Sequence, residues 1–504
     1  MIILFCSCKK SFLEETNPNA VAVPQLYTSE TDALLALNGC YESIRDNNCI
    51  AEESDLFTDQ RSDDTGTNDS QSNSGEPFQF GNYSLLPTNS YMAKHWLALY
   101  TTITRCNQLL ANIDAIKFAS DSTKTQYEAE AKFLRALIYF HLVRKWGDVP
   151  MTTVPLTTID QIKAATFRVK SSVVYQQIVA DMTDAAKSNL PVVQPAANRG
   201  RVSLQAVNAF LGQVYLTRYT TIDGGTNAKD LDSANYYLSA CYAMRTFSTL
   251  SSIPYTDVFD VNKKATCPEL IWQIVYIQGD PNTAAPTYHS NVAADNQALG
   301  ETINSLRPGT GAGNNVTHDL VNEYEANDPR GTFSIKFANA PSIQDWFVTK
   351  YRDTSPTASN KGFGGNDWIL MRYADVILML AEVNMYQGNN AGAIQYMDMV
   401  RARAGMPSYE VSSTTDASYM SKFTTLKLAL LHERRVELAF EHHRWFDLLS
   451  FFNINDLVTY MNSKNKADFG TAKLANFSNK DEYFPIPYGE TILDPVKMYQ
   501  NPGY

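Results

Sequence analysis

The stretch from 431 to 448, LHERRVELAFEHHRWFDL, constrains the fold more than any other part of the chain. Glu433, Glu437 and Glu441 recur every fourth residue, so a helix would place all three on one face. An apolar stripe at helical spacing runs beside them and consists of Leu431, Val436, Leu438, Ala439 and Phe440. Burying that stripe also takes the carboxylates out of water, which is costly unless cations pair with them. The rest of the chain must therefore supply buried partners for this helix.

An ion-pair network is the structure that this stretch predicts. Six of its residues are expected to form the network: Glu433, Arg434, Arg435, Glu437, Glu441 and Arg444. Residues elsewhere in the chain are expected to partner them: Asp328, Arg330, Arg372, Asp375, Arg401 and Arg403. Neighbouring arginines lower the pKa of a carboxyl group, which disfavours Glu437 and Glu441 as a general acid. A metalloprotease helix would need a histidine four residues after His432, where the chain has Val436. We expect no catalytic residue, no metal site and no cofactor.

The overall charge excludes one class of partner. The 504 residues carry a net charge of −11, whereas nucleic-acid binding requires a basic surface. The composition, with 44% hydrophobic and 19% charged residues, is that of an ordinary globular protein with ample material for a core. No apolar run of about 18 residues follows the N-terminus, so no transmembrane helix is expected.

The N-terminus, MIILFCSC, has the character of a short signal-peptide remnant that ends at a lipoprotein-type cysteine. We expect residues 1–7 to be that remnant and Cys8 to carry a lipid anchor, because the small residue Ser7 precedes it. Beyond Cys6 and Cys8 the chain has five cysteines without a C-x-x-C pair. That number and spacing favour buried free thiols, with a Cys40–Cys49 bridge as the alternative.

Helical periodicity extends over most of the chain. It predicts helices at 31–45, 91–116, 124–146, 171–188, 203–219, 230–247, 368–388, 390–404 and 423–449. Several of these segments share small residues four apart followed by a large aromatic residue or leucine, a pattern typical of tetratricopeptide hairpins. We therefore predict a mainly α fold, an irregular tetratricopeptide-like scaffold in a single domain spanning 8–504. The scaffold comprises 30–250 and 366–460, interrupted by a loop-rich insertion with short strands at 251–365 and followed by an extended tail at 461–504.

Two polar segments have compositions that suggest ligands without matching a template. The loop 46–89 contains TDQRSDDTGTNDSQSNSG, whose four aspartates do not have the spacing of a calcium loop. We expect it to be solvated, with calcium binding as the less favoured alternative. RPGTGAGNN at 307–315 does not connect a strand to a helix, so a flexible loop is favoured over a dinucleotide site.

Aromatic residues in polar loops are the candidates for sugar binding. A pyranose ring stacks its apolar face on tyrosine or tryptophan, while polar side chains bond its hydroxyl groups. The candidate ligand-binding residues are Tyr83, Tyr91, Trp96, Tyr288, Arg307, Trp346 and Tyr351. For each of them ordinary packing remains the alternative, and Trp272 within LIWQIVYI is expected in the core.

Motifs along nearly the whole chain resemble those of the SusD/RagB family of outer-membrane nutrient-binding lipoproteins. They follow one another in family order: WLALYTTITRCNQLLANI at 96–113, EAKFLRALIYFHLVRKWGDVP at 130–150, THDLVNEYEANDPR at 317–330, MRYADVILMLAEVNMYQG at 371–388, AIQYMDMVRARAG at 393–405, HERRVELAFEHHRWFDL at 432–448 and the terminal YFPIP with QNPGY. The shortened signal is the one departure from the family pattern.

The resemblance implies a non-catalytic lipoprotein on the outer membrane that captures oligosaccharides and delivers them to a SusC-like TonB-dependent transporter. Some relatives capture peptides, so a peptide-binding member is the alternative. A glycoside hydrolase is a remote second alternative, because it needs two carboxylates about 5 to 9 Å apart in an open cleft. The family fixes no ligand residues, since its binding loops vary.

Overall fold

Helical hairpins form the body of the molecule in the computed structural model, which describes residues 27–51, 53–66, 71–222, 224–280, 315–340, 343–353, 364–469 and 477–504. The helices of the first half are α1 (Glu30–Ile44), α2 (Phe78–Gly81), α3 (Ser90–Asn112), α4 (Asp121–Trp146), α5 (Ile159–Ala165), α6 (Ser171–Ala186), α7 (Leu204–Thr217) and α8 (Ala228–Ala243). Those of the second half are α10 (His318–Glu323), α11 (Pro329–Ser334), α13 (Tyr373–Tyr386), α14 (Asn390–Arg403), α15 (Tyr409–Thr415), α16 (Ala417–Lys422), α17 (Leu426–Leu438), α18 (Arg444–Phe451), α19 (Ile454–Ser463) and α20 (Tyr488–Thr491).

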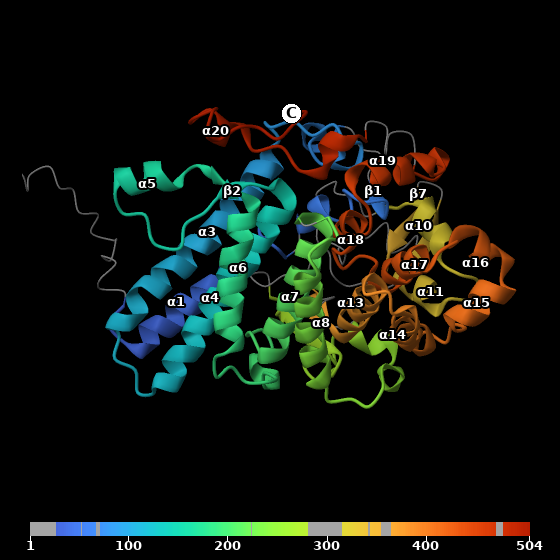
Figure 1. Ribbon diagram of the computed structural model, residues 1–504, viewed down its shortest axis with the longest axis horizontal. Coiled ribbons are helices and arrows are strands. Elements are labelled where there is room, and N and C mark those ends of the chain that lie inside the picture. The colour runs from blue at the N-terminus through green and yellow to red at the C-terminus, as the bar shows by residue number, and fades with distance from the viewer. Residues whose placement is uncertain are drawn as a thin grey trace, which may run out of the picture.

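The long helices pack in a series that follows the chain. In that series α1 and α4 pack on α3, α6 on α4, α7 on α6, α8 on α7, α13 on α8 and α14 on α13. Figure 1 shows this series running from the blue and teal helices at one end of the molecule to the orange helices at the other. The mainly α, tetratricopeptide-like architecture predicted from the sequence is therefore confirmed.

Local sequence sets where the long helices begin and end. Ser29 caps α1 through a capping box with Asp32, and the Asn89 side chain accepts hydrogen bonds from two amide groups at the start of α3. α4 ends at Gly147, whose φ of 71° is a conformation that glycine adopts readily. These signals are local, so the predicted starts and ends of most helices lie within a few residues of the observed ones.

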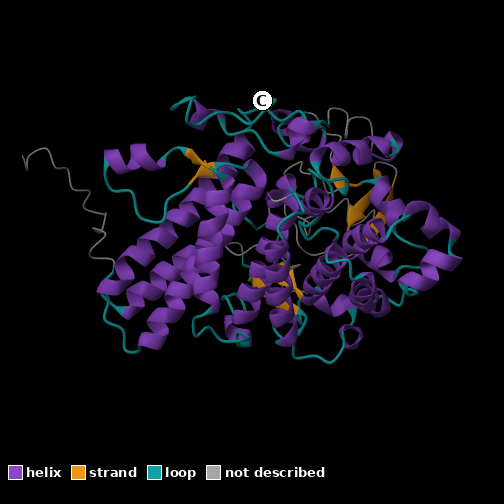
Figure 2. Cartoon of the chain, viewed as in Figure 1, coloured by secondary structure: helices purple, strands orange, loops and turns teal. Residues whose placement is uncertain are grey.

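Short sheets occupy the spaces between the helices (Figure 2). The strands are β1 (Thr65–Gly66), β2 (Val149–Pro150), β3 (Arg168–Val169), β4 (Leu270–Ile274), β5 (Asn315–Val316), β6 (Ile335–Ala340), β7 (Ile343–Val348) and β8 (Trp368–Arg372). One sheet has the strand order β1-β5-β7-β6, and β6 and β7 form its antiparallel hairpin. A second sheet pairs β4 with β8, and a third pairs β2 with β3. β4, β5, β6 and β7 all come from the segment predicted to contain short strands.

Two predicted helices differ from the observed structure. The segment 368–388 begins as strand β8 and becomes helical only at Tyr373, because WILMR pairs with β4. The segment 423–449 is two helices, α17 and α18, separated at 439–443. Phe440 and His442 in that break both have a φ of 64°, which a continuous helix does not allow. Periodicity alone cannot detect the break, since the apolar residues keep helical spacing through it.

The middle of the polar loop 46–89, residues 55–65, is buried, so the prediction of a solvated loop is wrong for this part of it. Asp59, Arg61, Asp63 and Asp64 have no exposed surface. This segment lies in the interior because distant segments supply counter-ions for its charged side chains, such as Arg444 for Asp63. The Arg61 Nη2 donates to Asp481 Oδ1 at 2.8 Å, with both side chains fully buried.

The lipid anchor stays a prediction, because Cys8 and the tether after it lie outside the described residues. The cysteines of the described residues are free thiols, as expected: Cys40, Cys49, Cys106, Cys241 and Cys267.

Among the described residues, none of the helices combines the length and apolar character needed to cross a bilayer. Trp272 is 1% exposed and belongs to the core, as predicted.

The close approach of α7 and α8 generates a prediction about stability. A methyl group on Gly212 would lie 2.4 Å from Leu238 Cγ and 3.1 Å from the Leu238 amide nitrogen. We expect Gly212→Ala to lower the free energy of unfolding by about 1–3 kcal/mol, because α8 must move to admit it. Gly39 of α1 has open space around it, so Gly39→Ala is the matched control and is expected to stabilise by about 0.5–1 kcal/mol. Urea unfolding of both variants tests this, and equal effects would contradict it.

Candidate functional site

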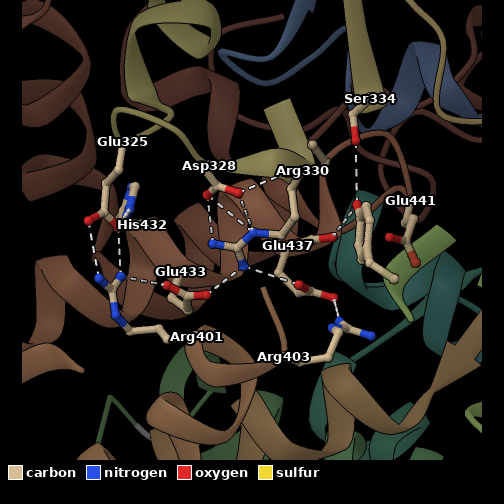
Figure 3. A network of polar contacts seen from close by, with 12 residues as sticks. Glu325, Asp328, Arg330, Ser334, Arg401, Arg403, His432, Glu433, Glu437 and Glu441 are labelled. Atoms are coloured by element: carbon tan, nitrogen blue, oxygen red, sulfur yellow. Dashed lines mark hydrogen bonds and ion pairs between the residues drawn. The ribbon is translucent and has the colours of Figure 1, made fainter. Parts of the chain in front are cut away.

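The three glutamates of α17 and its C-terminal break lie in a buried network of arginines (Figure 3). Arg330 Nη1 is 2.6 Å from Glu433 Oε1 and 3.1 Å from Glu437 Oε2. Arg372 contacts Glu437 at 2.6 Å and Glu441 at 2.7 Å. Further pairs complete the set: Arg330 with Asp328, Arg401 with Glu433 and Glu325, Arg403 with Glu437 and Glu269, Arg372 with Glu269, and Lys350 with Glu441.

The arginines of the stretch 431–448 pair with a separate set of acidic residues. Arg435 Nε is 2.8 Å from Asp64 Oδ1, and Arg444 Nε is 2.7 Å from Asp63 Oδ1. Arg434 lies between Asp375, at 3.0 Å, and Asp447, at 2.7 Å. All six residues of the predicted network thus make buried ion pairs, and the six partners predicted elsewhere in the chain all belong to it.

The electrostatics of this cluster do not suit acid catalysis. Burial alone would raise the pKa of Glu437, but Arg403, Arg372 and Arg330 outweigh it and hold that pKa well below its ordinary value. Glu441 is 3% exposed, and Arg372 and Lys350 overcome the effect of burial to lower its pKa to about 2. Both groups are therefore ionised at neutral pH and almost completely buried, which agrees with the structural interpretation.

One acidic group near the network has the donor atoms of a metal site. Glu325, His432 and Glu433 each place a potential ligand atom within 4.8 Å of the others. Arg401, however, is 2.7 Å from Glu325 and 3.0 Å from Glu433. Its guanidinium group therefore already provides the positive charge that a metal ion would bring. His432 bonds to Glu325 and Glu323, and the proximity of these carboxylates raises its pKa despite burial. Both ring nitrogens of His432 are thus already bonded to carboxylates, so the group is best described as part of the network.

The predicted aromatic ligand residues have separate locations. Tyr83 and Tyr351 have no exposed surface and Trp96 is 5% exposed, so none of these three rings is available to stack on a sugar. The Tyr83 hydroxyl instead donates to the carbonyl oxygen of Arg61. Their assignment as ligand residues is wrong, because each sits where a distant segment covers it. Tyr288 and Arg307 lie outside the described residues.

Tyr91 and Trp346 are the two candidates that remain partly exposed. Tyr91 lies in the first turn of α3, with the Lys94 ammonium 5.3 Å from its ring centroid. Trp346 lies on β7, directly opposite Phe337 of β6. The two rings of that cross-strand pair are 5.4 Å apart and inclined at 61°, and Phe337 is 39% exposed.

The face of the β6–β7 hairpin that carries this pair also carries an amide pair. Asn339 and Gln344 are opposite each other, two residues further along each strand, so they share the face of Phe337 and Trp346. The Gln344 Nε2 donates to Asn339 Oδ1 at 3.3 Å, and both residues are exposed. We call these four residues the hairpin face. It combines an apolar aromatic surface with amide donors and acceptors, the two chemical elements that a sugar ring requires.

The sequence predicted Trp346 but not its three companions. The alternation in IKFANA and IQDWFV, separated by Pro341 and Ser342, is a hairpin signal that would have paired Phe337 with Trp346. Without that register nothing distinguishes Asn339 and Gln344 from other polar residues of the chain.

The structure is therefore that of a helical-hairpin protein with a structural charge cluster and a small aromatic sheet surface. Two family models match separate parts of it: "SusD family" over 331–504 and "Starch-binding associating with outer membrane" over 11–216. SusD-like proteins P25 and P2 of Formosa agariphila are 27% and 25% identical to it, across all of this chain and 98% of theirs. The chain belongs to the SusD/RagB family.

A solved structure shows the same fold at lower identity. Surface glycan-binding protein A from Bacteroides thetaiotaomicron, in complex with laminarihexaose, superposes with a TM-score of 0.72 and 18% identity. The match covers 94% of this chain and all of that one. At this identity the similarity shows that the fold is shared.

The buried pair between Arg444 and Asp63 yields the second prediction. Arg444→Ala leaves Asp63 buried beside Arg435 and Lys464 with one cation fewer, so we expect the protein to lose about 3–5 kcal/mol of stability. Arg105→Ala is the control, because its pair with Glu42 is largely exposed and is worth about 0–1 kcal/mol. Thermal unfolding measures both. An unchanged unfolding temperature for Arg444→Ala combined with lost ligand binding would contradict the structural role.

The lowered pKa of Glu441 yields a prediction about pH. An ionised Glu441 stabilises the fold above its unfolded pKa of about 4.5, and this contribution is lost as the pH falls toward its folded pKa of about 2. Glu441→Gln cannot titrate, so it should be less stable than wild type by about 3–5 kcal/mol at pH 7. The difference should narrow by about 1.4 kcal/mol per pH unit within that window. Urea unfolding at pH 7, 5, 4 and 3 measures it, and a constant difference would exclude the ion pair as its cause.

Proposed function

We propose that this protein is a cell-surface glycan-binding lipoprotein that captures oligosaccharides and passes them to a SusC-like TonB-dependent transporter. In this proposal Cys8 carries the lipid that anchors it to the outer face of the outer membrane, and the protein performs no chemistry on its ligand. Membership of the SusD/RagB family supports this, as does the description of one matching family model, which names starch binding and the outer membrane.

The hairpin face is the single observation that carries the proposal. The exposed part of Phe337 and the partly exposed ring of Trp346 offer apolar surface to the face of a pyranose. The Asn339 Nδ2 and Gln344 Oε1 are positioned beside the rings to bond hydroxyl groups.

The attachment of the hairpin supports its role as a binding surface. Residues at both ends belong to the buried network: Arg330 lies on α11, which leads directly into β6, and Lys350 lies two residues after β7. The Thr349 amide also donates to the Ser334 carbonyl at 2.8 Å, which closes the base of the hairpin. A binding surface held in this way loses little conformational entropy when a ligand binds.

The absence of catalysis in this proposal rests on the carboxylates. The densest group of acidic side chains in the described residues is buried, ionised and paired with arginines, whereas hydrolysis requires a protonated carboxyl group that faces the substrate. Surface glycan-binding protein A, which shares the fold, was solved with laminarihexaose bound.

The proposed set of ligand residues also keeps Tyr91, Tyr288 and Arg307, as contacts beyond the hairpin face.

Replacing Trp346 tests the proposal. Purified protein is titrated calorimetrically with a panel of oligosaccharides that includes laminarihexaose, and with peptides of matched length. We expect at least one oligosaccharide to bind and Trp346→Ala to weaken it about tenfold or more, because stacking on the ring is lost. Trp346→Phe should retain part of the affinity.

Tyr236→Ala serves as the matched control, since Tyr236 is an aromatic residue on α8 with 68% of its surface exposed. It should bind like wild type, and all variants should unfold at similar temperatures. Binding of peptides alone would replace the glycan proposal with the peptide-binding alternative. Equal glycan affinity of wild type and Trp346→Ala would remove the hairpin face from the site.

A further inference from the structure

A cleft of about 440 Å³ lies beside α1, a helix that Figure 1 shows on the other side of the molecule from β7. Three segments form its walls: one face of α1, the turn at 197–201 and the end of β4. Its lining is rich in amide and guanidinium groups, contributed by Asn38, Arg45, Asn198, Arg199, Arg201 and Gln273. The partly buried ring of Tyr41 also lines it. This volume is within the usual range for sites that bind small molecules.

The carboxylates around this cleft are already paired with cations. Glu130 accepts from Arg201 at 2.7 Å and from the Tyr41 hydroxyl at 2.5 Å. Asp367 is shared by Arg199 and Lys264, each at 2.8 Å, so one negative charge faces two cations. Glu42, the acidic residue of the lining, is bound by Arg105. Cations therefore outnumber carboxylates around the cleft, although the net charge of the whole protein is −11.

Arg45 is the lining cation that makes no ion pair with any carboxylate in the described part of the chain. It is the C-cap residue of α1, where its backbone amide is bonded within the helix. Its guanidinium makes no ion pair with a carboxylate of the described residues, in contrast to those of Arg199 and Arg201. A guanidinium presents a planar set of donors that matches a carboxylate, so Arg45 gives the cleft an anion-binding group.

The amide side chains of the lining supply neutral hydrogen-bonding groups. Asn38 and Asn198 both line the cleft, and an amide can donate to or accept from a sugar hydroxyl. Gln273 is not counted with them, because its Nε2 is bonded to the Lys264 carbonyl and its Oε1 is buried.

We propose that this cleft is a second binding site, distinct from the hairpin face, and that it takes an acidic sugar residue of the uronic acid class. Arg45 binds the sugar carboxylate. Asn38 and Asn198 bond hydroxyl groups of the same sugar, and Tyr41 supplies the apolar contact. A neutral sugar would leave Arg45 without a counter-ion, and a simple inorganic anion would leave most of the cleft unfilled.

The test compares ligands that differ only in charge. D-glucuronate, D-galacturonate, D-glucose, D-galactose and inorganic phosphate are titrated into the full chain and followed by ligand-observed NMR and calorimetry. We expect a uronate to bind at least about tenfold more tightly than its neutral counterpart, and its affinity to fall as NaCl rises from 50 to 300 mM. Equal affinity for the uronate and the neutral sugar would overturn the proposal, and so would phosphate binding as tightly as the uronate.

Variants locate the site. Arg45→Gln should weaken uronate binding about tenfold or more, and Arg45→Lys should weaken it less, because it keeps the charge but loses the planar donor pair. Arg245→Gln changes the net charge equally from outside the cleft and should bind like wild type. Trp346→Ala should also keep uronate affinity, because that residue belongs to the hairpin face. Unchanged binding by Arg45→Gln, or loss of uronate binding in Trp346→Ala, would contradict the assignment.

Discussion

The ion pairs around Glu433, Glu437 and Glu441 are the interaction on which the rest of the structure depends. They join α17 to α11 through Arg330, to β8 through Arg372, and to α14 through Arg401 and Arg403. These segments are far apart in the sequence, so the pairs bring together parts of the chain that local helix formation cannot order. Any one of these guanidinium groups left alone in the interior would be strongly destabilising, which makes correct assembly of the whole set a condition for folding.

The break between α17 and α18 allows one stretch of sequence to serve two sides of the molecule. Before the break, glutamates face the arginines of α11 and β8; after it, Arg444 faces Asp63 of the buried loop. Lys350 occupies the break and donates to the carbonyl oxygens of Glu437 and Ala439, at 3.1 and 2.8 Å. A helix that ends inside a protein leaves carbonyl groups that need donors, and this lysine supplies them while also pairing with Glu441. The positive φ of Phe440 is thus compensated by contacts that only the folded chain provides.

Most of the helical scaffold could be predicted from the sequence because helix signals are local. The capping box at Ser29 and the glycine at 147 can be recognised without any knowledge of the fold, and the network residues were found through their crowding around three glutamates. The buried position of the loop at 55–65 could not be predicted, since its composition is that of a solvated loop. Its burial depends on ion pairs with distant residues such as Arg435, Arg444 and Asp481. The prediction that Tyr83 and Tyr351 are exposed was wrong for the same reason. The exposure of a side chain depends on the segments that cover it, and here those segments lie far away in the sequence. Phe337 could be recognised as a candidate only from the register of β6 and β7, and Arg45 only from the cleft that it lines. Neither feature can be read from one stretch of sequence.

The network also holds the surface that we propose as the ligand-binding site. Because it fixes Arg330 before β6 and Lys350 after β7, the hairpin between them is attached to the rigid interior at both ends, while Phe337 and Trp346 stay partly exposed. In the proposed function, the charged residues of the network therefore act on the ligand only indirectly, by holding the hairpin face. Substitutions on the hairpin face can change what is bound without disturbing the ion pairs, since the hydrogen bonds between β6 and β7 involve the backbone. A fold organised in this way keeps its charged interior constant while its binding surface is free to vary.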